Sequence, residues 1–430
     1  MFQRAESAAP VAVRSKTKQM KNRTVGIIGG GASGLMAAIS AARAGAQVTL
    51  IEHMDRVGKK ILSTGNGRCN LTNYRMEPEC YRCSQKDFPM KVIQGFGVEE
   101  TLEFFKYLGI VPKDRNGYVY PNSDQAASVL DVLRWETERL GIRVLLSCQV
   151  SVIKPQRDGG FLIRSSQGTL HTDTLILAAG SKAAPSTGSD GSGYELAKAL
   201  GHKVIKPLPA LVQLRCQGTL YKQLAGIRTE ARIRLLADGI CMAEDKGELQ
   251  LTDYGLSGIP VFQVSRFAAK ALYNKQEVTA VLNFMPQMSE EEFTVFLAER
   301  ARLRPQKTAE EFLTGLFHKK MIALWVKCSR ISKEKPVGTY SEEELRTLVR
   351  LIQQFEVNVE GTNSFEQAQV CCGGVSTEEV KEDTLESSYV PGVYFAGEIL
   401  DVDGICGGYN LQWAWSSGWI AGREAADVTN

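Results

Sequence analysis

Residues 24–52 read TVGIIGGGASGLMAAISAARAGAQVTLIE, and this stretch decides the fold. The β-branched run at 24–28 predicts a short strand, the small residues at 35–44 predict a helix, and residues 47–52 predict a second strand. A glycine-rich turn of the form G-x-G-x-x-G joins the first strand to the helix. This order of elements within about thirty residues predicts a Rossmann unit that binds a dinucleotide.

The three glycines of this turn have separate tasks. Gly29 permits the tight turn, Gly31 lets backbone approach a pyrophosphate, and Gly34 lets the helix pack close to the strand. The phosphates would lie at the helix N-terminus, where free N–H groups and the helix dipole favour negative charge. Glu52, at the end of the second strand, is placed to accept hydrogen bonds from the adenosine ribose. Because a carboxylate repels a 2′-phosphate, the site should hold FAD or NAD rather than NADP.

Three further segments have the composition of ligand-binding backbone. Residues 63–73, STGNGRCNLTN, gather glycine, amide and hydroxyl groups around one arginine, which suits the wrapping of a polar ligand. The apolar run at 170–180 ends in Ala178-Ala179-Gly180, small residues that let backbone lie against a ligand. Residues 392–398, GVYFAGE, predict a strand with an acidic end, and the pair Gly407-Gly408 offers a second helix N-terminus to the same cofactor.

Composition narrows the class of protein. The 430 residues carry 51 Lys and Arg against 48 Asp and Glu, a balance that argues against a dedicated binder of nucleic acid or anionic membrane. There is no apolar run long enough to span a bilayer, and the ten scattered cysteines indicate reduced thiols, so we expect a cytoplasmic protein. The four histidines are dispersed and predict no metal site. Residues 1–22 predict a disordered tail, which leaves Met20 as an alternative start.

The middle of the chain differs from both ends. Short strands and turns are predicted over 210–285, and helix-periodic segments follow at 290–304, 309–328 and 341–355. Strands followed by helices lack the alternation that a parallel sheet requires. We therefore expect this block to be an inserted domain.

The motifs together resemble those of one family. In order along the chain stand the fingerprint of residues 24–34, GNGRCNLTN at 65–73, LAAG at 177–180, GELQLTDYGLSG at 247–258 and AGEILDVDGICGGYNLQWAWSSG at 396–418. In these motifs and their spacing, residues 24–425 resemble the BaiN-like, aminoacetone-oxidase-like family of FAD flavoproteins. The resemblance implies an α/β fold with a glutathione-reductase-type, FAD-binding Rossmann-like domain, interrupted by an inserted β-barrel plus helical subdomain. The FAD-binding domain would comprise 23–190 and 365–430, and the insert, as substrate domain, 191–364.

The resemblance also implies a set of cofactor-binding residues. Ala32, Ser33 and Gly34 would hold the pyrophosphate, and Glu52 the adenosine ribose. The loop from Arg68 through Cys69 to Asn70 would lie on the flavin side, and the backbone of Val150 would contact the adenine. Glu398, Asn410 and Leu411 would line the ribityl chain and the isoalloxazine. From their places in the segments already named, and from the run RVGKK at 56–60 just before the polar loop, we add Gly29, Gly31, Lys60, Gly67, Ala179, Gly180, Gly397 and Gly408.

The reaction is left open between two enzyme classes. In the one we expect, NAD(P)H reduces FAD, which then reduces a C=C bond conjugated to a ketone in an apolar small molecule, with a 3-oxo-4,6-diene bile acid as the substrate type that the resemblance implies. In the other, FAD oxidises a small amine such as aminoacetone and oxygen yields hydrogen peroxide. Because Gly188–Gly193 lacks the fingerprint spacing, any nicotinamide would visit the flavin transiently. A third hypothesis is a non-catalytic flavin redox sensor or an RNA-associated flavoprotein. Catalytic residues, metal ligands and oligomeric state are not predicted.

Overall fold

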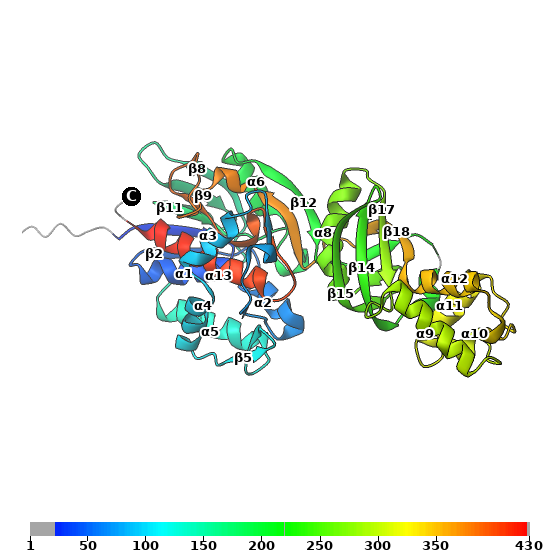
Figure 1. Ribbon diagram of the computed structural model, residues 1–430. Coiled ribbons are helices and arrows are strands. Elements are labelled where there is room, and N and C mark those ends of the chain that lie inside the picture. Colours follow the sequence, from blue (N-terminus) through cyan, green and yellow to red (C-terminus); the bar gives the residue numbers. More distant parts are fainter. Residues whose placement is uncertain (1–21, 219, 428–430) are drawn as a thin grey trace, which may run out of the picture.

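Three bodies lie in a row in the computed structural model, which describes residues 22–218 and 220–427. An α/β body holds both ends of the described chain, a barrel follows it, and a group of helices lies beyond the barrel (Figure 1). The predicted disordered tail and the alternative start at Met20 lie outside the described residues, except for Asn22.

A parallel sheet forms the centre of the α/β body. Its five strands run in the order β20-β11-β1-β2-β7, and every neighbouring pair is parallel. β1 is central because its apolar residues are buried on both faces, as the adjacent Ile27 and Ile28 are. The predicted strands at 24–28 and 47–52 are confirmed. The strands are β1 (Thr24–Ile28), β2 (Gln47–Ile51), β7 (Arg143–Leu145), β11 (Thr174–Leu177) and β20 (Val393–Phe395).

Two helices from opposite ends of the chain pack side by side against this sheet (Figure 1). α1 (Ala32–Arg43) follows β1, and α13 (Tyr409–Ala426) ends the described chain. They approach closely because α13 presents glycines: a Cβ at Gly418 would lie 2.4 Å from the carbonyl oxygen of Ser33, and one at Gly422 2.3 Å from that of Ala37. The first and last segments therefore build one unit, as predicted for an interrupted Rossmann-like fold.

An antiparallel sheet of β8, β9 and β10 covers the body near the adenine end of the predicted site. The sequence predicts one strand over 141–152, but the structure has two, β7 and β8, because Ser147 adopts a left-handed conformation (φ 51°) and turns the chain. Similarly, the apolar run at 170–180 divides between β10 and β11. The sheet consists of β8 (Val150–Pro155), β9 (Phe161–Ser165) and β10 (Gly168–Thr172).

Short elements complete the α/β body. Two small antiparallel sheets, β3-β6-β5 and β4-β21, lie beside helices that pack on the main core. The helices are α2 (Lys59–Ser63), α3 (Phe88–Gly95), α4 (Val98–Tyr107), α5 (Ala126–Arg139) and α6 (Ser192–Ala199). The strands are β3 (Thr72–Asn73), β4 (Tyr81–Cys83), β5 (Pro112–Arg115), β6 (Tyr118–Pro121) and β21 (Val402–Gly404).

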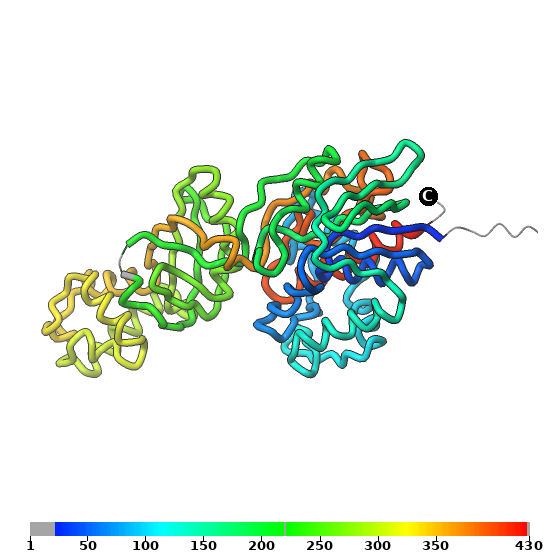
Figure 2. The backbone as a smooth tube through the Cα atoms, turned by 180° about the vertical axis from the view of Figure 1, so that it is seen from behind, coloured from blue at the N-terminus to red at the C-terminus, as the bar shows by residue number. Residues whose placement is uncertain are grey.

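Two antiparallel strands connect the α/β body to the barrel. β12 (Val204–Ala210) leads outward and β19 (Val370–Val375) leads back, and Figure 2 shows them side by side. A Cβ at Gly373 would lie 2.4 Å from the carbonyl oxygen of Lys206, so the two backbones require glycine there. Cys371 and Cys372, both on β19, are buried, as expected for small apolar residues.

The barrel is closed, in the order β13-β16-β15-β14-β17-β18. The sequence predicts only strands and turns over 210–285, and this is wrong for α8 (Ile259–Tyr273), which packs against β15 and β12. Pro260 in its first turn and buried Val261, Val264 and Ala268 at helical spacing were the missed signals. The strands are β13 (Leu214–Cys216), β14 (Arg228–Ala237), β15 (Ile240–Leu251), β16 (Gly255–Ser257), β17 (Val278–Asn283) and β18 (Phe355–Thr362).

The distal helices extend the core of the barrel. They are α7 (Leu220–Leu224), α9 (Glu290–Leu303), α10 (Ala309–Leu313), α11 (Lys319–Ser329) and α12 (Glu342–Gln353), and the segment predicted at 309–328 is divided between α10 and α11. One buried cluster contains residues from Leu214 to Val359, whereas α6 contributes Tyr194 and Leu196 to the cluster of the α/β body. The boundaries 191–364 for the inserted substrate domain stay a prediction. In the described ranges, no helix combines the length and apolarity that crossing a bilayer requires.

Candidate functional site: a dinucleotide-type cavity

A cavity of about 630 Å³ opens where β1, β2 and β11 end. The N-termini of α1 and α13 border it, and α8 reaches it from the barrel, through Ile259 and Phe262. Ligands of open parallel sheets bind outside the carboxyl ends of the strands, and free N–H groups at helix N-termini favour phosphate. The cavity therefore has the position and the two helix ends that a dinucleotide requires.

The glycine turn has the close contacts that the fingerprint predicts. Gly29 has φ 106°, and a Cβ there would lie 2.4 Å from the carbonyl oxygen of Ala178. A Cβ at Gly34 would lie 1.8 Å from the carbonyl oxygen of Gly29, so helix and strand can pack this closely only with glycine. A Cβ at Gly31 would have no neighbour within 4 Å, because it would project into open space at the cavity wall.

Glu52 is held by backbone donors at the end of β2. Its Oε2 accepts a hydrogen bond from the N–H of Gly30 (2.7 Å), and its Oε1 accepts one from the N–H of Met54 (2.8 Å). The side chain is only 8% exposed, yet it lines the cavity. A carboxylate fixed in this way presents its remaining lone pairs in a constant direction, which suits recognition of ribose hydroxyls.

Lys60 and Glu398 form an ion pair across the cavity. Lys60 Nζ lies 2.7 Å from Glu398 Oε2 and also donates to the carbonyl oxygen of Ala183. The other oxygen of Glu398 accepts hydrogen bonds from Ser181 Oγ (2.8 Å) and from the N–H of Cys371 (3.1 Å). Four segments of the α/β body therefore meet at one carboxylate. Sequence reasoning selected both residues of the pair without predicting their contact.

The loop between α2 and β3 curls through left-handed residues. Gly65, Asn66, Gly67 and Cys69 all have positive φ, between 54° and 83°. Cys69 is fully buried, which raises the pKa of its thiol to about 12, so it stays protonated at neutral pH. Asn70 is also buried, and its Oδ1 accepts no hydrogen bond from the described residues. A buried acceptor without a donor costs free energy, so a bound ligand with an N–H or O–H fits this position.

The cavity brings together most of the predicted cofactor residues. Those that line it are Gly29, Gly31, Ala32, Ser33, Glu52, Lys60, Arg68, Asn70, Val150, Ala179, Gly180, Glu398, Gly408, Asn410 and Leu411. The remaining ones, which do not line it, are Gly34, Gly67, Cys69 and Gly397. Their parts are internal: a Cβ at Gly397, for example, would lie 2.3 Å from Ser33 Oγ. The contacts of all these residues with a cofactor stay a prediction.

Sequence reasoning missed the wall opposite the nucleotide turn. It consists of Tyr118 and Tyr120 from β6, Leu211 after β12, and Ile259 and Phe262 from α8. The alternation in YVYP at 118–121 was an available signal for two tyrosines on one face. The contribution of α8 depends on how the barrel docks, which no local pattern indicates.

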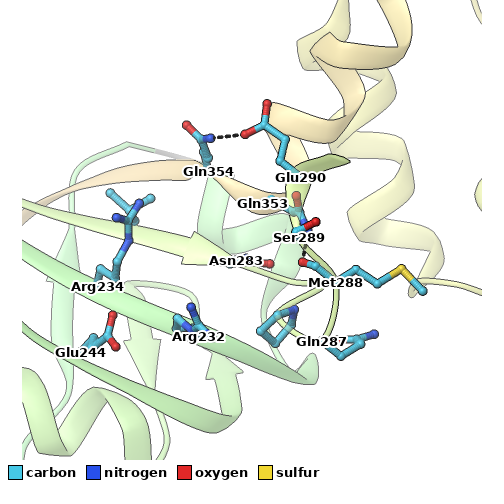
Figure 3. A pocket seen from close by; sticks show the side chains of 12 residues that line it. Arg232, Arg234, Glu244, Asn283, Gln287, Met288, Ser289, Glu290, Gln353 and Gln354 are labelled. Carbon is cyan, nitrogen blue, oxygen red and sulfur yellow. Dashed lines mark hydrogen bonds between the residues drawn. The ribbon is translucent and has the colours of Figure 1, made fainter. Parts of the chain in front are cut away.

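A second cavity, of about 440 Å³, lies where the barrel meets α9 and α12 (Figure 3). Its side chains are of mixed charge, with Arg232 and Arg234 on β14 and Glu244 on β15. Gln354 donates to Glu290 at its edge, as the dashed line in Figure 3 marks. None of the predicted site residues lines this cavity.

Comparison with known proteins agrees with this geometry. The family model described as the HI0933-like protein Rossmann domain matches residues 23–424. A 3-dehydro-bile acid delta(4,6)-reductase of Clostridium scindens is 47% identical and covers 94% of this chain and 99% of its own. A ribosomal RNA dihydrouridine synthase of Haemophilus influenzae is 29% identical over 91% of this chain and 96% of its own. Among solved structures, a 3-ketosteroid-delta4-(5alpha)-dehydrogenase of Rhodococcus jostii RHA1 matches with a TM-score of 0.46 at 15% identity, covering 96% of this chain and 99% of that one. The family model and the relative at 47% identity confirm the resemblance that the motifs indicated, and the chain belongs to the HI0933-like family.

Proposed function

We propose that the protein is an FAD-dependent reductase of C=C bonds conjugated to a ketone, with NAD(P)H as the electron donor. The observation that carries the proposal is the chemistry shared by two relatives with unlike substrates. A bile-acid delta(4,6)-reductase and a dihydrouridine synthase are named for products that have lost a C=C bond conjugated to a carbonyl group. The relative with 47% identity favours the ring ketone of a steroid-like molecule as the substrate.

The cavity fits FAD at one end and an apolar substrate at the other. Glu52 would bind the adenosine ribose, the α1 N-terminus the pyrophosphate, and the α13 N-terminus with Asn70 the flavin ring. When bound, FAD supplies hydride chemistry at N5. The chain's own residues orient the cofactor and exclude water, and Leu211, Ile259 and Phe262 offer apolar surface to a hydrocarbon skeleton.

The donor would reach the flavin without a nucleotide domain of its own. Residues 188–193 lack the fingerprint spacing and fold as a turn that runs into the first residues of α6, so they form no second Rossmann unit. NAD(P)H would then bind briefly at the cavity mouth, transfer its hydride and leave before the enone enters.

Two engaged carboxylates make oxidation of a small amine the weaker candidate. A cationic amine needs an anionic partner, but Glu52 already accepts two backbone N–H groups and Glu398 already pairs with Lys60. The third carboxylate that lines the cavity, Glu366, is exposed and accepts a hydrogen bond from Ser364 Oγ, so none of the three is a buried free anion. A substrate with a carbonyl group and a hydrocarbon body matches the cavity better.

Anaerobic stopped-flow spectroscopy of the purified FAD-loaded protein tests the proposal. We expect flavin bleaching by NADH or NADPH, and recovery of the oxidised spectrum when a steroid 4-en-3-one or a 3-oxo-4,6-diene is added. Mass spectrometry should find the steroid product heavier by two hydrogens. If only aminoacetone bleaches the flavin, and peroxide forms on admission of air, the protein is an amine oxidase and the proposed reductase activity is wrong. If a uridine-rich RNA restores the oxidised flavin spectrum and no enone does, the substrate is RNA.

A further inference from the structure

We propose that the Tyr120 hydroxyl donates a hydrogen bond to the carbonyl oxygen of the substrate, with the Arg68 guanidinium beside it. This inference rests on the proposed function, and it names the group that recognises the enone. The carbonyl end would lie at β6, and the hydrocarbon body would extend towards α8.

The geometry of β6 directs two tyrosines to the cavity. Val119 is fully buried behind the strand, whereas Tyr118 and Tyr120, two residues apart, both line the cavity. β6 is held in the middle of its sheet between β3 and β5, so the direction of these side chains is set by paired backbone. A donor on a paired strand is better positioned than one on a free loop.

Tyr118 and Tyr120 lie at the end of the cavity where the flavin would bind. A Cβ at Gly65 would lie 3.4 Å from Tyr120 Cε1, and one at Gly407 would lie 2.7 Å from Tyr118 Cε1. The strand therefore packs between the curled loop and the N-terminus of α13. Glu52 and the glycine turn, which would hold the adenosine and the pyrophosphate, lie at the ends of β2 and β1.

Tyr120 has a free hydroxyl that stays protonated. No hydrogen bond within residues 22–218 and 220–427 engages this hydroxyl, although the residue is half-buried. Burial raises the pKa of Tyr120 against the opposing positive charges of Arg115 and Arg68. At neutral pH the side chain is thus a phenol, a donor that awaits an acceptor.

Neighbouring arginines hold the ring and supply charge. The Arg115 guanidinium lies 5.4 Å from the centre of the Tyr120 ring and is itself fixed by Asp124 at 2.6 Å. Arg68, at the end of the curled loop, lines the cavity and forms no ion pair with any described residue. Its charge remains available to an oxygen that becomes negative.

This pairing matches the electron flow of enone reduction. For a simple enone, the bound cofactor would supply a hydride, whose two electrons come from NAD(P)H, to the C=C carbon remote from the carbonyl. The π electrons then move toward the carbonyl oxygen. Water gives a proton to the carbon next to the carbonyl group, which completes the saturated ketone. A hydrogen bond and a positive charge at that oxygen are stronger in the transition state than before it, so they accelerate the step.

Tyr118 is the less suitable donor. Its ring packs on Gly407, and the residue is 39% exposed, so water competes for its hydroxyl more than it does at the less exposed Tyr120. A substrate oxygen gains less from such a group than from the half-buried Tyr120.

The variant Y120F tests the proposal, with Y107F as the matched control. Tyr107 is 70% exposed on α4 and does not line the cavity. The control therefore removes a phenol hydroxyl from a position outside the proposed site. FAD content and thermal unfolding should equal those of the wild type in both variants. We expect reoxidation of the reduced flavin by an enone to slow about 10²–10³-fold in Y120F alone, the range found when one oxyanion donor is removed. Bleaching by NAD(P)H should stay unchanged.

Ligand binding separates this inference from the proposed function. The dissociation constants of a saturated steroid 3-ketone and of its 3-deoxy analogue are measured through the flavin absorption spectrum. Y120F should weaken the binding of the ketone about tenfold, which corresponds to about 1.4 kcal/mol of binding free energy. The affinity for the deoxy compound should stay unchanged. Equal effects on both ligands, or on neither, would overturn the role of Tyr120. If the wild type reduces no enone, the proposed function fails, and the ketone-to-deoxy comparison still decides whether Tyr120 binds a carbonyl.

Discussion

Arg266 and Asp403 form a buried ion pair with two contacts, Nε to Oδ2 and Nη2 to Oδ1, each at 2.8 Å. Their side chains are 10% and 3% exposed. Arg266 belongs to α8 beside the barrel and Asp403 to β21 of the α/β body, so the pair joins the two, although neither residue lines the cavity. Because Ile259 and Phe262 lie on the same helix, this contact also positions the apolar wall.

Breaking this pair by D403N should destabilise the protein strongly. Removal of one partner leaves the Arg266 guanidinium buried without a counter-charge, which typically costs about 3–5 kcal/mol. Urea unfolding, followed by tryptophan fluorescence, measures the loss.

The double variant R266M/D403L is the matched control for D403N. It removes both charges of the pair and should recover part of the stability, because a buried pair replaced by apolar groups is often nearly neutral, while Arg82, opposite Asp403 on β4, loses its nearby anion. An R266M/D403L protein as unstable as D403N would show that packing around these residues, rather than the unpaired charge, determines the loss.

Two alanine substitutions should separate the tasks of the turn glycines. G31A places a methyl group in open space with φ near −79°, so the protein should fold normally but lose FAD, whose pyrophosphate needs that space. G34A places a methyl group 1.8 Å from the carbonyl oxygen of Gly29, so it should lower the melting temperature even without FAD. Circular dichroism of FAD-free protein and fluorescence titration with FAD measure the two properties. Normal FAD affinity in G31A would contradict the predicted site.

The sequence was informative where a function depends on local backbone. The fingerprint at 29–34, the strands at 24–28 and 47–52 and the positions of Lys60 and Glu398 follow from short motifs, since each motif constrains its own turn or strand end. The contact between Lys60 and Glu398 joins residues 338 positions apart, and no periodicity encodes such a distance. The wall that contains Ile259 and Tyr120 depends on how α8 and β6 dock. Docking is decided by packing between distant segments, so it appears only in the structure.

Glu136 should make stability depend on pH. The carboxylate is 4% exposed and contacts Arg139 (2.7 Å) on its own helix and Arg43 (2.6 Å) on α1. The hydrogen bond from Arg139, with the contact from Arg43, lowers the pKa of Glu136 in the folded state. Since the folded pKa lies below the unfolded one, the contribution to stability is complete above about pH 4.5 and is lost as the pH falls through the folded pKa.

The variant E136Q should therefore lose stability at neutral pH and not in acid. We expect a loss of about 1–3 kcal/mol at about pH 7, which shrinks towards about pH 3 as the wild type becomes protonated. E138Q, an exposed change on the same helix, should match the wild type throughout. Urea unfolding at several pH values measures both, and a constant difference between E136Q and wild type would contradict the lowered pKa.

Substitution by leucine should change the stability of the protein in opposite directions at Asn70 and at Asn73, three residues apart. Among the described residues no donor reaches the buried Oδ1 of Asn70, whereas Asn73 donates to the carbonyl oxygen of Gly407 (3.0 Å) and accepts from the N–H of Arg75 (3.0 Å). A buried, unsatisfied acceptor costs about 1–3 kcal/mol, and an apolar group of the same shape removes that cost. N70L should thus stabilise the FAD-free protein, while N73L destabilises it by breaking two hydrogen bonds.

In N70L the rise in melting temperature on adding FAD should be smaller than in wild type, because the oxygen that the cofactor would satisfy is gone. Calorimetry with and without FAD measures all three proteins, and an N70L protein that gains as much from FAD as the wild type would remove Asn70 from the cofactor site.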